Sequence, residues 1–215
     1  MELTDVMRGA ASIRRFRPDP VPDAVLYRVL DSARFAPSGG NRQGWRVVVV
    51  REEATRRRLR DLYLRSWTEY HQPVFRRMGR GPSPADAYAQ HLDEVPVHLI
   101  VLVERSALVT TIAPLDASRV VAGASIYPFV HNVALALRAE GLGTTLSTVL
   151  VPVEAEVAEL LGIPAEYALA AHLGVGWPAE PHPSRLRRRP VEEFATRERF
   201  DGEPLRSSES AIPTD

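Results

Sequence analysis

Cysteine and lysine are both absent from the 215-residue chain. Without cysteine there are no disulfides, thiol nucleophiles, thiolate zinc sites or iron–sulfur clusters. Without lysine there is no Schiff-base chemistry, no anchor for pyridoxal phosphate and no P-loop. The chemistry that remains uses carboxylates, histidines, hydroxyls, a metal held by oxygen or nitrogen, or a cofactor bound without a covalent link.

An excess of one charge and a long apolar run are also missing. The 27 arginines balance 27 acidic residues, so no basic field favours nucleic acid. The longest apolar runs, such as residues 47–50 and 99–103, have the length of a strand rather than the ~20 residues of a membrane span. Residues 1–12 carry two acids and no apolar core, unlike a signal peptide. We therefore expect a cytoplasmic protein with neither a nucleic-acid nor a membrane partner.

Hydrophobic periodicity predicts one sheet and several helices. The apolar spacing indicates helices at residues 2–9, 22–35, 53–78, 117–140 and 153–161, and strands at 45–50, 97–103, 144–149 and 167–175. No glycine-rich turn follows the first strand, so the order indicates an α+β fold and not a Rossmann fold. The helix over 117–140 is apolar on most faces, which predicts that it is central or lies in an interface.

Glycine, proline and polar residues mark the irregular segments. Glycine and proline crowd residues 79–95, where we expect a mobile excursion. Polar residues predict a loose tail over 201–215. The glycine pairs at 141/143 and 174/176 lack the third glycine of a dinucleotide fingerprint, and they suit a helix C-cap and a strand exit better.

The six histidines show no metal-binding pattern. They stand at positions 71, 91, 98, 131, 172 and 182, and none forms a close-spaced ligand pair, so we expect no metal site. His98, His131 and His172 lie within apolar elements, which indicates core or interface positions. His71 is a candidate for substrate contact. Ser38 lacks the strand–turn–helix setting of a catalytic nucleophile, and no catalytic acid or base is nominated.

Two features suit a bound ligand. The loop APSGGNRQGW at 36–45 leaves several backbone groups free beside an amide side chain, which suits the polar edge of a flat heterocycle. Arginines gather at 8, 14, 15 and 17 and again at 185, 187, 188 and 189. These clusters are either two solvated surfaces or two halves of one phosphate site, since guanidiniums bind phosphate through paired hydrogen bonds.

Six motifs, in this order along the chain, resemble the FMN-dependent nitroreductase family. They are SIRRF at 12–16, APSGGNRQGW at 36–45, AEGLGT at 139–144, LLGIP at 160–164, GVGWP at 174–178 and RRPVEE at 188–193. The resemblance implies a mixed, mostly antiparallel sheet wrapped by helices and an intertwined homodimer with the 117–140 helix at its centre. It implies one FMN-binding domain over 1–200, with 68–95 as a variable lid.

The resemblance also implies cofactor-binding residues. Ser12 and Arg14 would hold the FMN phosphate together with Arg187 and Arg188. Arg8 would supply the charge that many members carry where this chain has Ala10.

The flavin itself would contact two other segments. It would be lined by Pro37, Ser38, Gly39, Asn41 and Gln43. Ser147 and Thr148 would cover the ring, with a backbone N–H near flavin N5. These two residues stand where well-known members have an acidic residue and glycine, which leaves the substrate class open.

The family's chemistry implies an oxidoreductase. NADH or NADPH would reduce the flavin, and an electron-poor small molecule such as a nitroaromatic or quinone would then be reduced at the same site, with ping-pong kinetics. The sequence leaves two alternative functions open. One is a flavin-dependent oxidase or dehydrogenase of a small metabolite, and the other is a non-catalytic flavin-binding protein.

Overall fold

A four-stranded antiparallel sheet, in the order β1-β2-β4-β3, lies at the centre of the fold. Its strands are β1 (Trp45–Val50), β2 (Val97–Glu104), β3 (Gly143–Ser147) and β4 (Tyr167–Gly176). The computed structural model describes residues 1–108, 121–183 and 186–206. The sheet belongs to the first of two units, Met1–Pro183, and the second unit is Ser184–Asp215. The α+β class expected from the sequence is confirmed.

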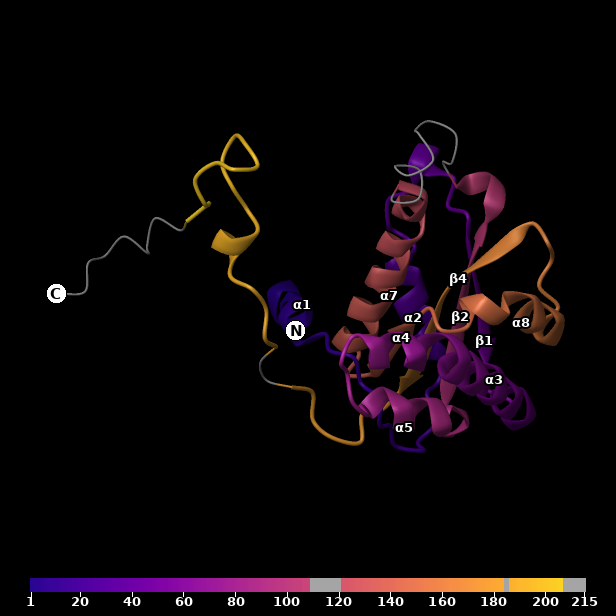
Figure 1. Ribbon diagram of the computed structural model, residues 1–215. Coiled ribbons are helices and arrows are strands. Elements are labelled where there is room, and N and C mark those ends of the chain that lie inside the picture. The colour runs from indigo at the N-terminus through magenta and orange to yellow at the C-terminus, as the bar shows by residue number, and fades with distance from the viewer. Residues whose placement is uncertain (109–120, 184–185, 207–215) are drawn as a thin grey trace. The chain divides into compact units, whose positions relative to one another are not determined.

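Helices cover both faces of the sheet (Figure 1). Helices α2 (Asp23–Ala33) and α7 (Tyr127–Ala139) bury an apolar cluster on one face. Helices α3 (Glu53–Ser66), α5 (Pro84–Gln90) and α8 (Glu154–Leu161) bury a second cluster on the other. Two further short helices are α1 (Leu3–Gly9) and α4 (Gln72–Arg77).

The helix expected over 53–78 is broken by a π-helical turn at Trp67–His71. The proline at 73 causes the break, because its ring lacks an N–H and clashes with the carbonyl four residues earlier. The backbone widens instead, and the Gln72 N–H donates to the Trp67 carbonyl five residues back. Helix α4 then starts with Pro73 in its first turn, where a missing N–H costs nothing.

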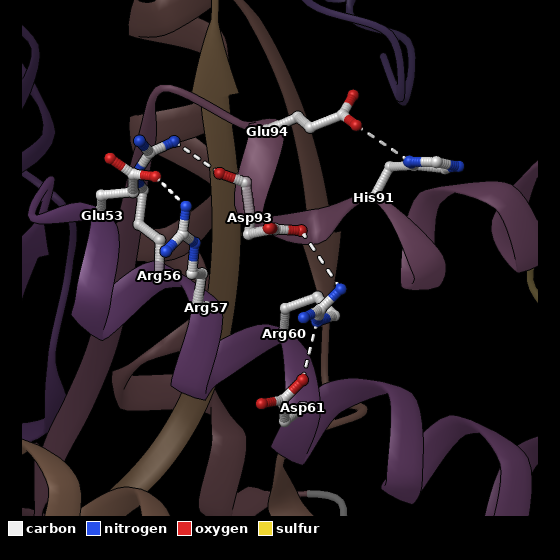
Figure 2. Close-up of polar contacts among 8 residues, drawn as sticks. All are labelled: Glu53, Arg56, Arg57, Arg60, Asp61, His91, Asp93 and Glu94. Atoms are coloured by element: carbon white, nitrogen blue, oxygen red, sulfur yellow. Dashed lines mark hydrogen bonds and ion pairs between the residues drawn. The ribbon is translucent and has the colours of Figure 1, made fainter.

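Residues 79–95 contain more regular structure than the sequence predicts. Ser83 and Asp86 form a capping box that starts α5, and a 3-10 turn, η3 (Leu92–Glu94), follows it. The η3 turn is tied to the polar side of α3, as Figure 2 shows: Arg56 donates to the Asp93 carbonyl at 2.5 Å, and Arg60 lies 3.8 Å from the Asp93 carboxylate. These contacts fix η3, the turn that follows α5, against α3.

Helix α7 is shorter than expected and is buried on one face only. It begins at Tyr127, after a 3-10 turn at Gly123–Ser125, with Pro128 in its first turn. Phe129, Val133 and Leu137 are buried, whereas His131 is exposed. Within the described part of one chain, α7 is therefore not buried all round and His131 is not a core residue; the alternative, an interface position for both, stays a prediction. Residues 117–120 of the expected helix lie outside the described residues, as does most of the expected tail.

Candidate functional site

A cavity of about 660 Å³ opens between the end of β3 and the segment that runs from α3 to α5. Its volume lies in the usual range of small-ligand sites. Aromatic side chains and guanidiniums share its wall. The aromatic residues are Tyr63, Trp67, Phe75 and Tyr88, and the arginines are Arg14, Arg76 and Arg80. His71, the histidine singled out for substrate contact, also lines it, with Nδ1 3.2 Å from the Ser66 carbonyl oxygen.

The N-terminal segment reaches this cavity because it pairs with β3. Ser12 forms a parallel bridge to Thr144, and the Ile13 N–H donates to the Thr144 carbonyl at 2.9 Å. Gly143 permits the approach, since a Cβ there would lie 2.8 Å from the Ile13 side chain. Extended backbone sends successive side chains to opposite sides. Arg14 consequently lines the cavity, while Arg15 turns to solvent and pairs with Glu180 at 2.7 Å.

The turn after β3 forms the floor of the cavity through a buried hydrogen-bond network. Ser147 Oγ accepts from the Val149 N–H at 3.1 Å and lies 3.0 Å from the Tyr63 hydroxyl. Ser66 Oγ donates to the Val149 carbonyl. Burial raises the pKa of Tyr63, so its hydroxyl stays protonated and available as a donor. The exposed Thr148 is left at the apex of the turn.

Two buried histidines lie beneath this floor. His98 Nδ1 and His172 Nε2 are 2.9 Å apart, and the Tyr63 ring meets His172 edge-on at 5.7 Å. Burial lowers the pKa of His172 to about 3, and it lowers the pKa of His98 well below the usual value for histidine. Both rings are therefore neutral at pH 7, and one nitrogen of each donates or accepts within the pair. Core placement of these two histidines agrees with the sequence.

The outer wall is held together by one carboxylate. Asp86 accepts from Trp67 Nε1 at 3.0 Å, Gln72 Nε2 at 2.7 Å and the Ser83 N–H at 2.7 Å. The Ser83 amide, followed by Gln72 and Trp67, lowers the pKa of Asp86 to about 2. The π-helical turn, α4 and α5 are thus joined at an ionised group. Asp86 was not among the residues expected at the site, although its capping box with Ser83 is visible in the sequence.

The loop at 37–43 is well ordered but lies elsewhere in the chain. Ser38 Oγ accepts from the Gln43 N–H at 3.0 Å, and the Gly39 N–H donates to Ser125 Oγ at 3.0 Å. Asn41 and Gln43 take left-handed backbone conformations, with φ of 53° and 51°. Both side chains are exposed and are joined by a 3.1 Å hydrogen bond from Gln43 Nε2 to Asn41 Oδ1.

Strand register shows that this loop and the Ser12 segment lie at opposite ends of the sheet. Trp45, next to the loop, pairs with Val103 of β2. Val97, at the other end of β2, pairs with Val175, which in turn pairs with Thr144, the partner of Ser12. The span from Val97 to Val103 corresponds to roughly 20 Å at the rise of an extended chain.

The cofactor-binding residues expected from the sequence thus fall into separate groups. Arg14, Ser147 and Thr148 meet at the cavity. The exposed Arg8 lies on α1. The loop residues Pro37, Ser38, Gly39, Asn41 and Gln43 do not line this cavity in one chain. Arg187 and Arg188 are exposed residues of the second unit.

Among the residues that the structure describes, no three histidine or carboxylate side chains come close enough to share a metal ion. No described helix has both the length and the apolar character needed to span a membrane.

Comparison with known proteins identifies the family. The model of the nitroreductase family matches residues 7–177. The chain is 36% identical over 176 residues to NADH dehydrogenase of Thermus thermophilus, which covers 79% of this chain and 83% of that protein. It is 34% identical over 192 residues to 5,6-dimethylbenzimidazole synthase of Rhodospirillum rubrum, over 84% of each.

A solved structure gives the same answer for the fold. Iodotyrosine deiodinase, bound to FMN and 3-iodo-L-tyrosine, matches with a TM-score of 0.70 at 27% identity, over 91% of this chain and 100% of that chain. The resemblance inferred from the six motifs is confirmed, and the chain belongs to the nitroreductase family and has its fold.

Proposed function

We propose that the protein is an FMN-dependent oxidoreductase that uses NADH or NADPH to reduce an electron-poor aromatic or quinone acceptor. The observation that carries the proposal is the meeting of Arg14 with the Ser147–Thr148 turn at an aromatic cavity. FMN is bound by the related deiodinase structure, and a relative at 36% identity is an NADH dehydrogenase. These two relatives support a flavin and a nicotinamide as ligands here.

The residues present suit FMN. Arg14 lines the cavity with a guanidinium, and the exposed Ser12 carries a hydroxyl two residues earlier in the same extended segment; in this proposal the two bind the FMN phosphate. The Thr148 N–H has no acceptor among the described residues, whereas the Val149 N–H is already engaged by Ser147 Oγ. In this proposal the Thr148 amide is the donor to flavin N5. Arg8, on α1, would add a further charge to the phosphate site.

The separation of the loop from the cavity supports a homodimer. Pro37, Ser38, Gly39, Asn41 and Gln43 lie roughly 20 Å along the sheet from the Ser12 segment. We propose that the loop of one copy completes the cavity of the other. Exposed apolar side chains are available for such an interface; on α1, α2 and the following loop they are Leu3, Met7, Tyr27 and Phe35. The FMN-binding domain would extend over 1–200, with 68–95 as its lid.

The chemistry divides between the cofactor and the chain. When bound, FMN supplies hydride transfer, first from the nicotinamide and then to the acceptor. The chain's residues bind, orient and exclude water. The buried histidines are neutral and lie below the floor, and the Tyr63 hydroxyl is engaged by Ser147. No residue of this cavity is proposed as a catalytic acid or base.

The test compares two neighbouring arginines. Arg14→Ala removes a guanidinium that lines the cavity, whereas Arg15→Ala removes an exposed partner of Glu180. FMN affinity, measured by flavin fluorescence, should fall roughly 10- to 150-fold for Arg14→Ala, the equivalent of about 1.5–3 kcal/mol. It should change little for Arg15→Ala. The flavin released from wild-type protein on denaturation should be FMN. Equal affinities of the two variants, or release of FAD, would contradict the proposal.

A second candidate is oxidation of a small reduced metabolite with oxygen as the final acceptor. The 34% identity to 5,6-dimethylbenzimidazole synthase supports this second candidate function. Anaerobic mixing of the flavin-loaded protein with NADH and with NADPH separates the two. Rapid bleaching supports the reductase. Bleaching only by another reduced metabolite supports the oxidase, and no bleaching by any donor supports a flavin-binding protein without turnover.

A further inference from the structure

The outer wall of the cavity carries two guanidiniums whose positions are set by α4. Arg76 belongs to the helix, and its Nη2 lies 3.4 Å from Gln72 Oε1. Arg80 follows Gly79, which has a φ of +71° and turns the chain back, so that the Arg80 N–H donates to the Phe75 carbonyl at 3.0 Å. The Arg80 guanidinium then lies 5.4 Å from the centre of the Phe75 ring. Both residues line the cavity.

These two charges have no carboxylate partner. Among the described residues, neither Arg76 nor Arg80 forms an ion pair, whereas Arg57 and Arg65 of the preceding helix α3 pair with Glu53 and Glu156. The one carboxylate in the cavity wall, Asp86, is occupied by Trp67, Gln72 and Ser83. The wall therefore carries a net positive charge, with Arg14, Arg76 and Arg80 against the single carboxylate Asp86, beside a cavity large enough for a ligand.

Aromatic rings flank the same two charges. Trp67 stacks on His71 with centroids 6.0 Å apart and rings within 9° of parallel, and it contacts Phe75 at 5.5 Å. Such walls favour a planar ring. Guanidiniums favour a planar anion that can accept two hydrogen bonds, such as a carboxylate.

We propose that Arg76 and Arg80 bind the carboxylate of an aromatic substrate, whose ring packs against Trp67 and Phe75. The proposal rests on the proposed function only in placing the reacting end of this substrate toward Arg14 and Thr148. It narrows the substrate class from electron-poor aromatics in general to those that carry an anionic group.

The test uses two probes of nearly equal shape and different charge, 4-nitrobenzoate and 4-nitrobenzamide. Their dissociation constants for the FMN-loaded protein are measured by calorimetry, without reductant, and their KM values by turnover. Wild type should bind the benzoate more tightly. Because both arginines are exposed, the Arg76→Gln/Arg80→Gln double variant should weaken benzoate binding roughly tenfold, and each single variant less. The benzamide should be little affected.

The matched control is Arg77→Gln, which removes the same charge from the same helix at a residue that does not line the cavity. It should leave the preference for benzoate unchanged. The proposal is overturned if wild type does not prefer the benzoate, if both probes weaken equally, or if Arg77→Gln has the same effect. Circular dichroism shows whether the double variant is folded. If it is not, the two single variants provide the test.

FMN affinity of each variant is measured in parallel, because a phosphate of the cofactor is the other anion that these arginines could bind. A tenfold loss of FMN affinity with an unchanged benzoate preference assigns them to the cofactor and overturns the proposal. If wild type binds no FMN, the proposed function fails. Calorimetry on the flavin-free protein then still decides whether the carboxylate site exists.

Discussion

The two faces of the central sheet differ in what they bury. On β2, the side chains Val97, Leu99, Val101 and Val103 point to the face covered by α2 and α7 and belong to an apolar cluster. The alternate positions point to α3 and α5, and the first of them is His98. β4 repeats the difference, with Leu173 on the first face and His172 on the second.

The second face also buries apolar side chains such as Ile100 and Leu102, but it adds the buried polar pairs that lie under the cavity, and for that reason it is called the polar face here. Burying a polar group costs free energy unless a hydrogen bond replaces water, so the polar face is held by specific pairs such as His98–His172 and Tyr63–Ser147. The apolar face needs only shape and area. We infer that one side of each central strand serves only to stabilise the fold, while the other side both stabilises the fold and positions the binding site.

Truncation on the apolar face should have the largest effect. Leu99 is fully buried, so Leu99→Ala should lower the free energy of unfolding by about 2–5 kcal/mol, through lost burial and the cavity left behind. Urea unfolding at pH 7 measures this. Val49→Ala on β1 is the control, because Val49 is 40% exposed and should cost much less. A loss below about 1 kcal/mol for Leu99→Ala would contradict the claim that burial on the apolar face stabilises the fold.

Lowering the pH should reduce the stability of the protein through the two buried histidines of the polar face. The unfolded chain binds a proton on each histidine near pH 6.5, whereas the folded His172 does so only near pH 3. Between about pH 6.5 and pH 3 the unfolded state therefore binds more protons than the folded state, so the free energy of unfolding falls as the pH drops. At pH 5 the loss should be about 2 kcal/mol for His172 relative to pH 7, with a further loss from His98.

Urea unfolding at pH 7 and pH 5 measures the acid effect. His172→Gln should reduce the difference between the two pH values, because the titrating group is gone. His131→Gln, at an exposed position of α7, should leave the difference unchanged. A wild type equally stable at both pH values would contradict the assignment of neutral, buried histidines.

The two tyrosines of the polar face should respond differently to loss of their hydroxyls. The Tyr63 hydroxyl contacts Ser147, so Tyr63→Phe should cost about 0.5–1.5 kcal/mol. It should also weaken FMN binding, because Ser147 holds the turn that carries Thr148. Urea unfolding and flavin titration measure the two effects. An unchanged stability would show that the network does not hold the floor.

Tyr88→Phe should have the smallest effect and the opposite tendency. The Tyr88 hydroxyl is buried and has no hydrogen-bond partner among the described residues. Its removal should be neutral or stabilising by up to about 1 kcal/mol, because an unsatisfied polar group is lost. Gly174 makes room for this hydroxyl, since a Cβ there would lie 2.2 Å from it. Destabilisation of Tyr88→Phe equal to that of Tyr63→Phe would indicate a hidden partner.

The strands were predictable from the sequence, and the helix boundaries around the cavity were not. Runs such as 45–50 and 97–103 are β-branched and apolar, and they became strands within two residues of the expected ends. Around 67–90, the apolar spacing indicated one helix over 53–78 and did not reveal the π-helical turn that precedes Pro73. Abundant glycine and proline concealed α5, although Ser83 and Asp86 cap it.

The site was predictable in its parts but not in its arrangement. The motif at 12–16 identified Arg14, and the structure brings it to Ser147 and Thr148. The pairing of His98 with His172, 74 residues apart, depends on the register between β2 and β4, which no local pattern encodes. The charges of Arg76 and Arg80 indicate an anion site only in the folded structure, where both line the cavity and Asp86 is hydrogen-bonded to Trp67, Gln72 and Ser83.

If the 37–43 loop completes the flavin site of a second copy, as we propose, its backbone affects how selectively it binds. Asn41 and Gln43 already hold left-handed conformations that cost residues other than glycine about 1 kcal/mol or more each, and Ser38 and Ser125 fix the loop through hydrogen bonds. The ordering cost of these residues is thus met during folding and not during association. A preorganised loop of this kind meets its ligand as a rigid template, which favours tight binding of one shape over loose binding of many.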